Sequence, residues 1–271
     1  MDLDFEKALT YIAKDPQWGN KLLAGAGLML TSFAVFVVPA LCLIIAPGVI
    51  AAITFFATLL LSMLIWIVIS GYICETASKK INTPDDEILP DWKDFGKLFS
   101  LGFKYFLGYF LYFLPLCLIG LLFFVFISLG FYSSYSGLIG AGVFSFIFLT
   151  VFGAFLVFLY VLTMAFLPLM MTSFFKDEKI LSFVNFKNAF NLLKNNVSNY
   201  LILILLFIAI TILAQLVCSF LIATVIGIIL LPIVYMYVYY VIADICAQFA
   251  LTAQKNTAVE QSVENNENPS C

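Results

Sequence analysis

The sequence contains no histidine and no arginine, and all 13 of its basic residues are lysines. Imidazole is the side chain most suited to proton transfer near neutral pH, and it is a common metal ligand. The planar guanidinium group grips carboxylates and phosphates at two points. Because both groups are absent, we expect no histidine-based catalysis, no histidine metal site and no arginine clamp.

Charge of either sign is also scarce, since 11% of the residues are charged and 63% are hydrophobic. In a soluble domain about a quarter of the residues are charged. Three long stretches carry no charge at all, namely residues 22–74, 105–175 and 195–243. One helix needs about 20 apolar residues to cross a bilayer. The stretches therefore predict an integral membrane protein that crosses the membrane several times.

The positions of the lysines predict the number of spans and their orientation. All of the lysines lie in residues 1–21, 79–104, 176–194 and the C-terminal tail. Two helices in each uncharged stretch place every lysine on one side of the membrane, whereas a third helix in the middle stretch divides them. We therefore expect a six-span, multi-pass domain over residues 22–252 of the cytoplasmic membrane, with both termini in the cytoplasm. The expected spans are residues 22–45, 49–73, 105–131, 141–171, 200–222 and 228–250.

The segment before the second uncharged stretch, residues 89–106, combines charges with large aromatic rings. From Trp92 onward the rings recur at helical spacing, and lysines lie on another face. Such a helix is typical of segments that lie in the headgroup layer, with the rings toward lipid. We expect it to start after Asp91 as N-cap, with Trp92, Phe95, Phe99, Phe103, Lys93 and Lys97 at the membrane interface. The alternative is that the rings pack against the protein's own spans.

The same pattern precedes the third uncharged stretch. Residues 1–21 hold a weaker amphipathic copy, with Phe5, Leu9 and Ile12 on one face and Lys7 and Lys14 on another, and we also expect Trp18 at the membrane interface. The expected interface residues before the third stretch are Phe183, Phe186, Phe190, Lys187 and Lys194. The pattern predicts an all-α integral membrane protein whose six transmembrane helices form three hairpins, each preceded by a cytoplasmic interfacial amphipathic helix. Units of two spans cannot be inverted, and this disfavours the inverted repeats of many transporters.

Two acidic residues are candidates for a functional role. Asp244 is the only charged residue inside an expected span, and Glu75 lies just beyond the end of one. Intramembrane acids often mark substrate or ion pathways. Asp244 is close enough to the end of its span for water or a loop lysine to reach it, so we favour a structural role. On that basis Asp244→Asn is expected to cost about 1–2 kcal/mol.

The rest of the sequence holds no motif for chemistry. The six cysteines form no CxxC pair and are typical of small buried apolar residues. We expect no catalytic residue, no cofactor, no metal ion and no nucleic-acid surface. The polar residues 253–271 predict a disordered cytoplasmic tail.

Several short motifs occur in a fixed order along the chain. An aromatic residue and Asp-Pro-x-Trp precede the first expected span, Gly-Tyr ends the second, and Leu-Pro-x-Trp is followed by a glycine. These residues are Tyr11, Asp15, Pro16, Trp18, Gly71, Tyr72, Leu89, Pro90, Trp92 and Gly102. From residue 5 to residue 250 the chain thereby resembles a prokaryotic membrane family known as domain of unknown function 4013. The resemblance implies a multispanning membrane protein without an established activity, although lysines stand here where arginines are expected after Gly-Tyr.

These features predict a non-enzymatic membrane protein that organises lipids or partner proteins through its interfacial helices. The expected partners are membrane lipids with anionic headgroups, other membrane proteins or a second copy of the chain. The alternative is a transporter or channel for a small solute or a lipid. The interior distinguishes the two, because a polar, water-filled cavity between the hairpins favours transport and a dry interior favours the organising role.

Overall fold

The computed structural model describes residues 3–45, 48–84, 88–135 and 139–267, apart from the side chains of residues 36–45, 129–135, 139–147, 225–226 and 257–267. All regular structure in these residues is helical. In chain order the elements are α1 (Phe5–Tyr11), a 3₁₀ helix (Ile12–Lys14), α2 (Trp18–Ile45), α3 (Val49–Asn82), α4 (Phe95–Tyr135), α5 (Ile139–Asp177), a second 3₁₀ helix (Ile180–Val184), α6 (Phe186–Asn195), α7 (Val197–Ile222) and α8 (Val225–Glu267).

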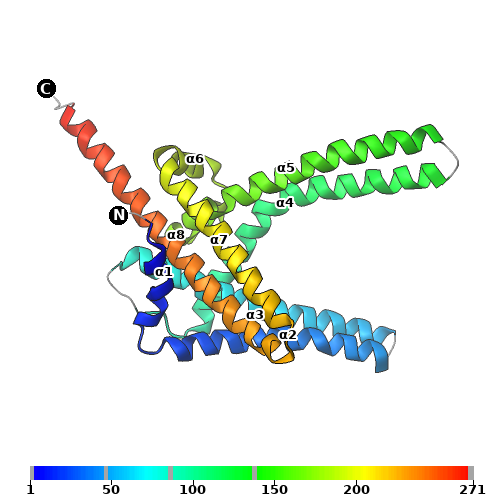
Figure 1. The fold of residues 1–271 in the computed structure, drawn as a ribbon, viewed down its shortest axis with the longest axis horizontal. Coiled ribbons are helices and arrows are strands. Elements are labelled where there is room, and N and C mark those ends of the chain that lie inside the picture. Colours follow the sequence, from blue (N-terminus) through cyan, green and yellow to red (C-terminus); the bar gives the residue numbers. More distant parts are fainter. Residues whose placement is uncertain (1–2, 46–47, 85–87, 136–138, 268–271) are drawn as a thin grey trace.

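Consecutive long helices lie side by side, α2 with α3, α4 with α5, and α7 with α8 (Figure 1). The α2–α3 pair and the α4–α5 pair diverge from each other toward their connecting turns, on the right of the view in Figure 1. The buried core lies at the opposite end, where α3, α5 and α8 meet. Its largest buried side chains include Tyr72, Phe174, Phe175 and Tyr240.

Five of the described helical segments are long and apolar enough to cross a membrane. They are Val49–Asn82, Phe95–Ser128, Phe148–Asp177, Val197–Ile222 and Gly227–Asn256. The expected first span lies in α2, where the side chains of residues 36–45 are outside the described part, as are those of residues 141–147 in the expected fourth span. The described helices therefore indicate a multi-pass membrane protein, while the count of six spans stays a prediction.

The outer parts of the helix pairs expose large apolar side chains, among them Phe56, Phe124, Phe158 and Phe220. Soluble monomers rarely expose such a wide apolar surface. Every backbone polar group inside a helix is already hydrogen-bonded, so a helix with an apolar exterior is suited to hydrocarbon. These surfaces are therefore the parts of the molecule that face lipid.

The expected interfacial helix starting after Asp91 is not present. Residues 88–94 form an irregular loop, and α4 begins at Phe95 and continues without interruption through the apolar region. Its N-cap is Asp94, whose Oδ1 accepts a hydrogen bond from the Lys97 amide at 3.1 Å. No chain break or proline separates the basic first turns from the apolar turns. A helix that has started extends at little cost, so the two expected helices are one.

The expected helix over Phe183, Phe186 and Phe190 also starts later than the pattern predicts. Phe183 lies in the second 3₁₀ helix and is fully buried, with its ring centroid 5.3 Å from that of Tyr105. It is therefore a core residue and not a membrane-interface residue. α6 begins at Phe186, and the rings of Phe186 and Phe190 are exposed. Helical spacing did not distinguish these rings because the turn at Asn185 changes the direction of the chain.

The two ends of the chain also differ from expectation. The region from residue 253, predicted to be disordered, continues α8 as a helix to Glu267. It contains no glycine, and its only proline is Pro269, so the helix extends at little cost. At the N-terminus, Tyr11 and Ile12 are buried and α1 packs against α8. The apolar side of this segment therefore covers protein.

Candidate functional site

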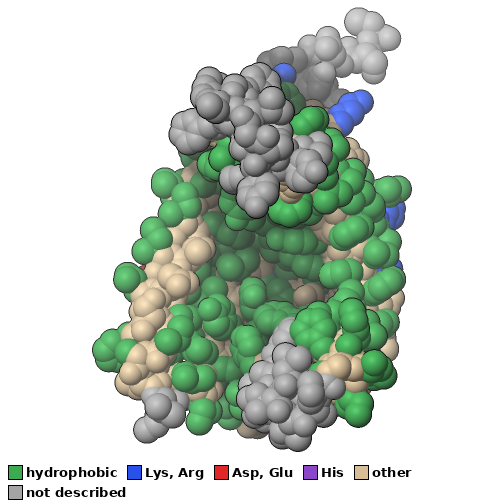
Figure 2. All heavy atoms as spheres, turned by 90° about the vertical axis from the view of Figure 1, so that its right-hand side faces the viewer, with side chains coloured by type: hydrophobic (Ala, Val, Ile, Leu, Met, Phe, Trp, Pro, Cys, Tyr) green, Lys and Arg blue, Asp and Glu red, His purple; other side chains and the backbone are tan. Residues whose placement is uncertain are grey.

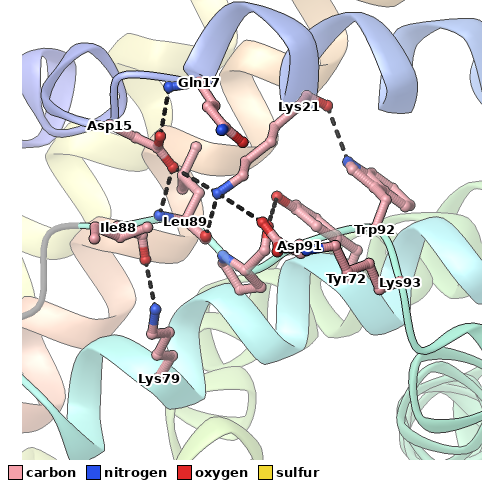
Figure 3. A network of polar contacts seen from close by, with 11 residues as sticks. Asp15, Gln17, Lys21, Tyr72, Lys79, Ile88, Leu89, Asp91, Trp92 and Lys93 are labelled. Atoms are coloured by element: carbon pink, nitrogen blue, oxygen red, sulfur yellow. Dashed lines mark hydrogen bonds and ion pairs between the residues drawn. The ribbon is translucent and has the colours of Figure 1, made fainter.

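The loop over residues 88–93 is held against α2 and α3 by polar contacts (Figure 3). Asp15 Oδ2 accepts hydrogen bonds from the Lys21 ammonium at 2.8 Å and from the Leu89 amide at 2.9 Å. Lys21 Nζ also donates to the Leu89 carbonyl at 2.6 Å and lies 3.1 Å from Asp91 Oδ1. Burial raises the pKa of Asp15, but the hydrogen bonds from Lys21, Gln17 and Leu89 outweigh it and keep that pKa below its ordinary value. Asp15 therefore remains an anion that holds the loop in place.

Aromatic residues complete this loop contact. The rings of Tyr72 and Trp92 are stacked, with centroids 3.9 Å apart and planes 2° apart. The Tyr72 hydroxyl donates to the Pro90 carbonyl at 2.7 Å, and Trp92 Nε1 donates to the Lys21 carbonyl at 3.0 Å. Trp92 therefore packs on the protein, as the alternative interpretation of residues 89–106 expects, and does not share a lipid-facing surface with Phe95.

The motif glycines lie where α3 and α4 cross. A Cβ on Gly71 would overlap the Leu98 carbonyl, and a Cβ on Gly102 would overlap the Ile67 carbonyl. Only glycine allows the two backbones this close approach, as in other membrane helix contacts built on small residues. The Asp-Pro-x-Trp, Gly-Tyr and Leu-Pro-x-Trp motifs and the glycine that follows them thus lie at one junction between α2, α3 and α4.

Asp244 is buried and paired with a lysine. Its Oδ1 lies 3.3 Å from Lys80 Nζ, and its Oδ2 accepts a hydrogen bond from Gln248 Nε2 at 2.7 Å. Lys80 Nζ also lies 3.8 Å from the centre of the Tyr11 ring, a cation–π contact. Both charged side chains are almost fully buried, at 3% and 0% exposure. The expected environments for Asp244 were water or a loop lysine; the structure shows a lysine, but Lys80 belongs to α3 and not to a loop.

The remaining expected site residues lie on the surface. Glu75 Oε1 accepts from Lys97 Nζ at 2.6 Å between α3 and α4, and Lys93 pairs with the exposed Asp91. Other expected interface residues are exposed on α4 and α6, namely Phe95, Phe99, Phe103, Phe186, Lys187, Phe190 and Lys194, and Trp18 at the start of α2 is also exposed. The structure does not gather these residues into one site.

An apolar cavity of about 620 Å³ lies between α3, α4, α5, α7 and α8. It is lined by Trp66, Ile69, Ser70 and Ile73, by Tyr105 and Tyr109, by Met164, Leu167, Pro168 and Met171, by Phe207, Ile208, Thr211 and Ile212, and by Tyr239 and Ile242. Figure 2 shows the molecule hollowed on the side where the helix pairs diverge, with hydrophobic side chains lining the hollow. The volume is in the range of small-molecule binding sites.

Nothing in the sequence pattern predicted this cavity. Its lining residues come from five separate helices, and each reads locally as part of an apolar span. The periodicity of a span that is apolar on all sides does not show which face is covered by a neighbouring helix. In the described residues, no group of three or more Cys, Asp or Glu side chains is placed to hold a metal ion. Because its wall is mainly apolar, the cavity is suited to an apolar ligand.

The comparisons with known proteins concern the family. The model of the family described as "Protein of unknown function (DUF4013)" matches residues 54–223, which include the Gly-Tyr and Leu-Pro-x-Trp motifs. The Asp-Pro-x-Trp motif at Asp15 lies outside the matched range. The searches of curated proteins and of solved structures gave no match. Since the matched range is more than half of its length, the chain belongs to the DUF4013 family.

Proposed function

We propose that this protein is a non-enzymatic membrane protein that binds a lipid chain in the apolar cavity and thereby organises lipid in the cytoplasmic membrane. The proposal includes six spans with both termini in the cytoplasm, because that arrangement places all lysines on one side. The observation that supports it is the chemistry of the cavity wall, in which mainly apolar side chains from five helices line an open cavity of about 620 Å³.

The cavity wall favours a lipid over a polar solute. The few polar groups on it are hydroxyls and an indole, such as those of Ser70, Tyr239 and Trp66, and none of the described residues that line it is charged. A polar solute entering such a site loses its hydration without gaining equivalent hydrogen bonds. A hydrocarbon chain loses no hydrogen bond and contacts the whole wall.

The exposed rings and lysines at the basic end support contact with anionic headgroups. Phe99 and Phe103 of α4 and Phe190 of α6 are exposed, and Lys187 lies on α6. Each lysine close to an anionic surface contributes about 1 kcal/mol, and this contribution falls with salt. These contacts orient the protein at the surface while the cavity holds the chain.

Filling the cavity is expected to remove bound lipid. Thr211→Phe places a ring in the wall between Ile208 and Ile212, and we expect retained lipid per protein after detergent purification to fall at least about fivefold, because the displaced chain loses its apolar contacts. Lipid is measured by mass spectrometry of the purified full chain. Thr31→Phe, on the exposed side of α2, is the matched control and should retain the parent amount. Equal lipid in both variants contradicts the proposal.

Transport of a lipid or a small solute is the second candidate, and one observation favours it. Asp244, which lies inside the expected sixth span, is buried and paired with Lys80, and intramembrane acids often belong to transport pathways. Flux into proteoliposomes tests it. If the Lys80→Met/Asp244→Asn variant folds and keeps its lipid but loses a flux that the parent shows, the transport interpretation replaces the organising one.

A further inference from the structure

A second cavity, of about 420 Å³, lies where α5, α6 and α8 come together, and its wall is polar. The side chains that line it include Ser173 and Lys176 of α5, Asn191 and Lys194 of α6, and Gln254 of α8. It shares no residue with the apolar cavity. The proposed function does not involve this second cavity.

The charges in this cavity favour an anion. Lys176 and Lys194 make no ion pair with any described residue. Among the described residues, the only carboxylate in the wall is Asp177, whose Oδ2 accepts a hydrogen bond from the Ser182 hydroxyl at 3.1 Å. Two ammonium groups and one engaged carboxylate leave a net positive charge, and the amide of Asn191 adds neutral donors.

A buried hydroxyl in the wall lacks a partner. Ser173 is 5% exposed, and its Oγ makes no hydrogen bond in the described structure. The adjacent Thr172 donates to the Pro168 carbonyl at 2.8 Å, as helical hydroxyls often do. An unpartnered buried hydroxyl destabilises a fold. A ligand atom within the cavity would complete the hydrogen bonding of Ser173.

We propose that this cavity binds a phosphate group, with Lys176 and Lys194 pairing with its charge and the Ser173 hydroxyl donating to one of its oxygens. Charge-assisted hydrogen bonds to phosphate are about twice as strong as neutral ones. The phosphate belongs either to the headgroup of a membrane lipid or to a soluble phosphate ester. The site is separate from the apolar cavity, and its binding does not require the lipid chain proposed there.

Both lysines also lie in the last turn of a helix, Lys176 in α5 and Lys194 in α6. A cation there interacts favourably with the helix dipole. That role accounts for the positions of the two charges but not for the cavity between them or for the hydroxyl of Ser173. The two roles predict different results when the side chains are replaced.

The test has two arms. In the soluble arm, the delipidated full chain in detergent is titrated with glycerol 3-phosphate, and binding is measured by calorimetry. In the lipid arm, the chain is placed in nanodiscs with and without phosphatidic acid, and bound lipid is measured by native mass spectrometry. We expect saturable binding in at least one arm. Lys194→Gln should weaken it about tenfold and Ser173→Ala about fivefold. Binding in the lipid arm alone identifies a lipid headgroup, and binding in the soluble arm alone identifies a phosphate ester.

Lys179→Gln is the matched control, because Lys179 is exposed near the same end of α5 but does not line the cavity. It should bind phosphate like the parent. Ser173→Ala should leave the melting temperature unchanged or raise it, since it removes an unpartnered hydroxyl. Three results would each overturn the proposal: no saturable binding in either arm, equal weakening by Lys179→Gln, or a lower melting temperature for Ser173→Ala with unchanged binding.

Discussion

Replacing Asp244 by asparagine is expected to lower the free energy of unfolding by about 3–5 kcal/mol, because it leaves the Lys80 ammonium buried without its counter-charge. This cost is larger than the one expected from the sequence, because the structure shows the two side chains buried and 3.3 Å apart. An asparagine keeps the hydrogen bond with Gln248 but not the charge. The Tyr11 ring compensates only part of the loss. The measurement is thermal unfolding in detergent.

Two further variants isolate the buried charge. Lys80→Met/Asp244→Asn removes both charges and should recover most of the lost stability, since a buried pair is often replaceable by uncharged residues. Glu75→Gln breaks the exposed pair with Lys97 and should cost about 0–1 kcal/mol. If Asp244→Asn is as mild as Glu75→Gln, the environment of Asp244 is wetter than this structure shows.

Replacing Gly102 by alanine is expected to lower the free energy of unfolding by about 2–3 kcal/mol. The added Cβ meets the carbonyl of Ile67, a backbone atom that moves only if α3 and α4 move apart. Overpacking of this kind costs about 1–3 kcal/mol, and separating the helices also removes their contact around Gly71. The measurement is again thermal unfolding in detergent.

Gly120→Ala is the control in the same helix, because nothing lies within 4 Å of a Cβ built there. Alanine is the better helix former by about 1 kcal/mol, so this variant should match or exceed the parent. Gly71→Ala/Gly102→Ala should cost less than the sum of the two single changes, since both relieve the same crossing. Equal effects of Gly102→Ala and Gly120→Ala would show that the helices are not in backbone contact.

The long helices were largely predictable from the sequence. Absence of charge over residues 49–73 and 200–222 marks segments apolar enough to cross a membrane, and both lie within helices that qualify. The family was also predictable, because motifs such as Gly71-Tyr72 resemble it and the family model matches residues 54–223. These features are local, and a local pattern is what a single sequence displays.

Features that depend on distant partners were not predictable in the same way. Helical spacing placed Trp92 on a lipid-facing stripe, but Tyr72, twenty positions earlier, stacks on it and the loop stays irregular. Phe183 reads like Phe186 in the sequence, yet Tyr105 and Phe174 enclose it. The two cavities are likewise defined by helices far apart along the chain, so neither was visible as a motif.

The close contact between α3 and α4 lies next to the apolar cavity. Close crossing at Gly71 and Gly102 and the buried pair of Lys80 and Asp244 fix α3 against α4 and α8. The helix pairs diverge beyond these contacts, and the apolar cavity lies beside Ile69 and Ile73, on the same part of α3. Rigid contacts near a cavity keep it preformed, which lowers the cost of binding.

Photo-crosslinking of the full chain in liposomes with a phospholipid that carries a diazirine on its acyl chain tests the central claim most directly. Labelled peptides are identified by mass spectrometry. We expect labelling concentrated on the cavity wall at Met164–Met171 and Phe207–Ile212, reduced by Thr211→Phe and unchanged by Thr31→Phe. Labelling spread evenly over the lipid-facing surface at Phe56, Phe124 and Phe220, and insensitive to Thr211→Phe, would contradict a bound lipid in the cavity.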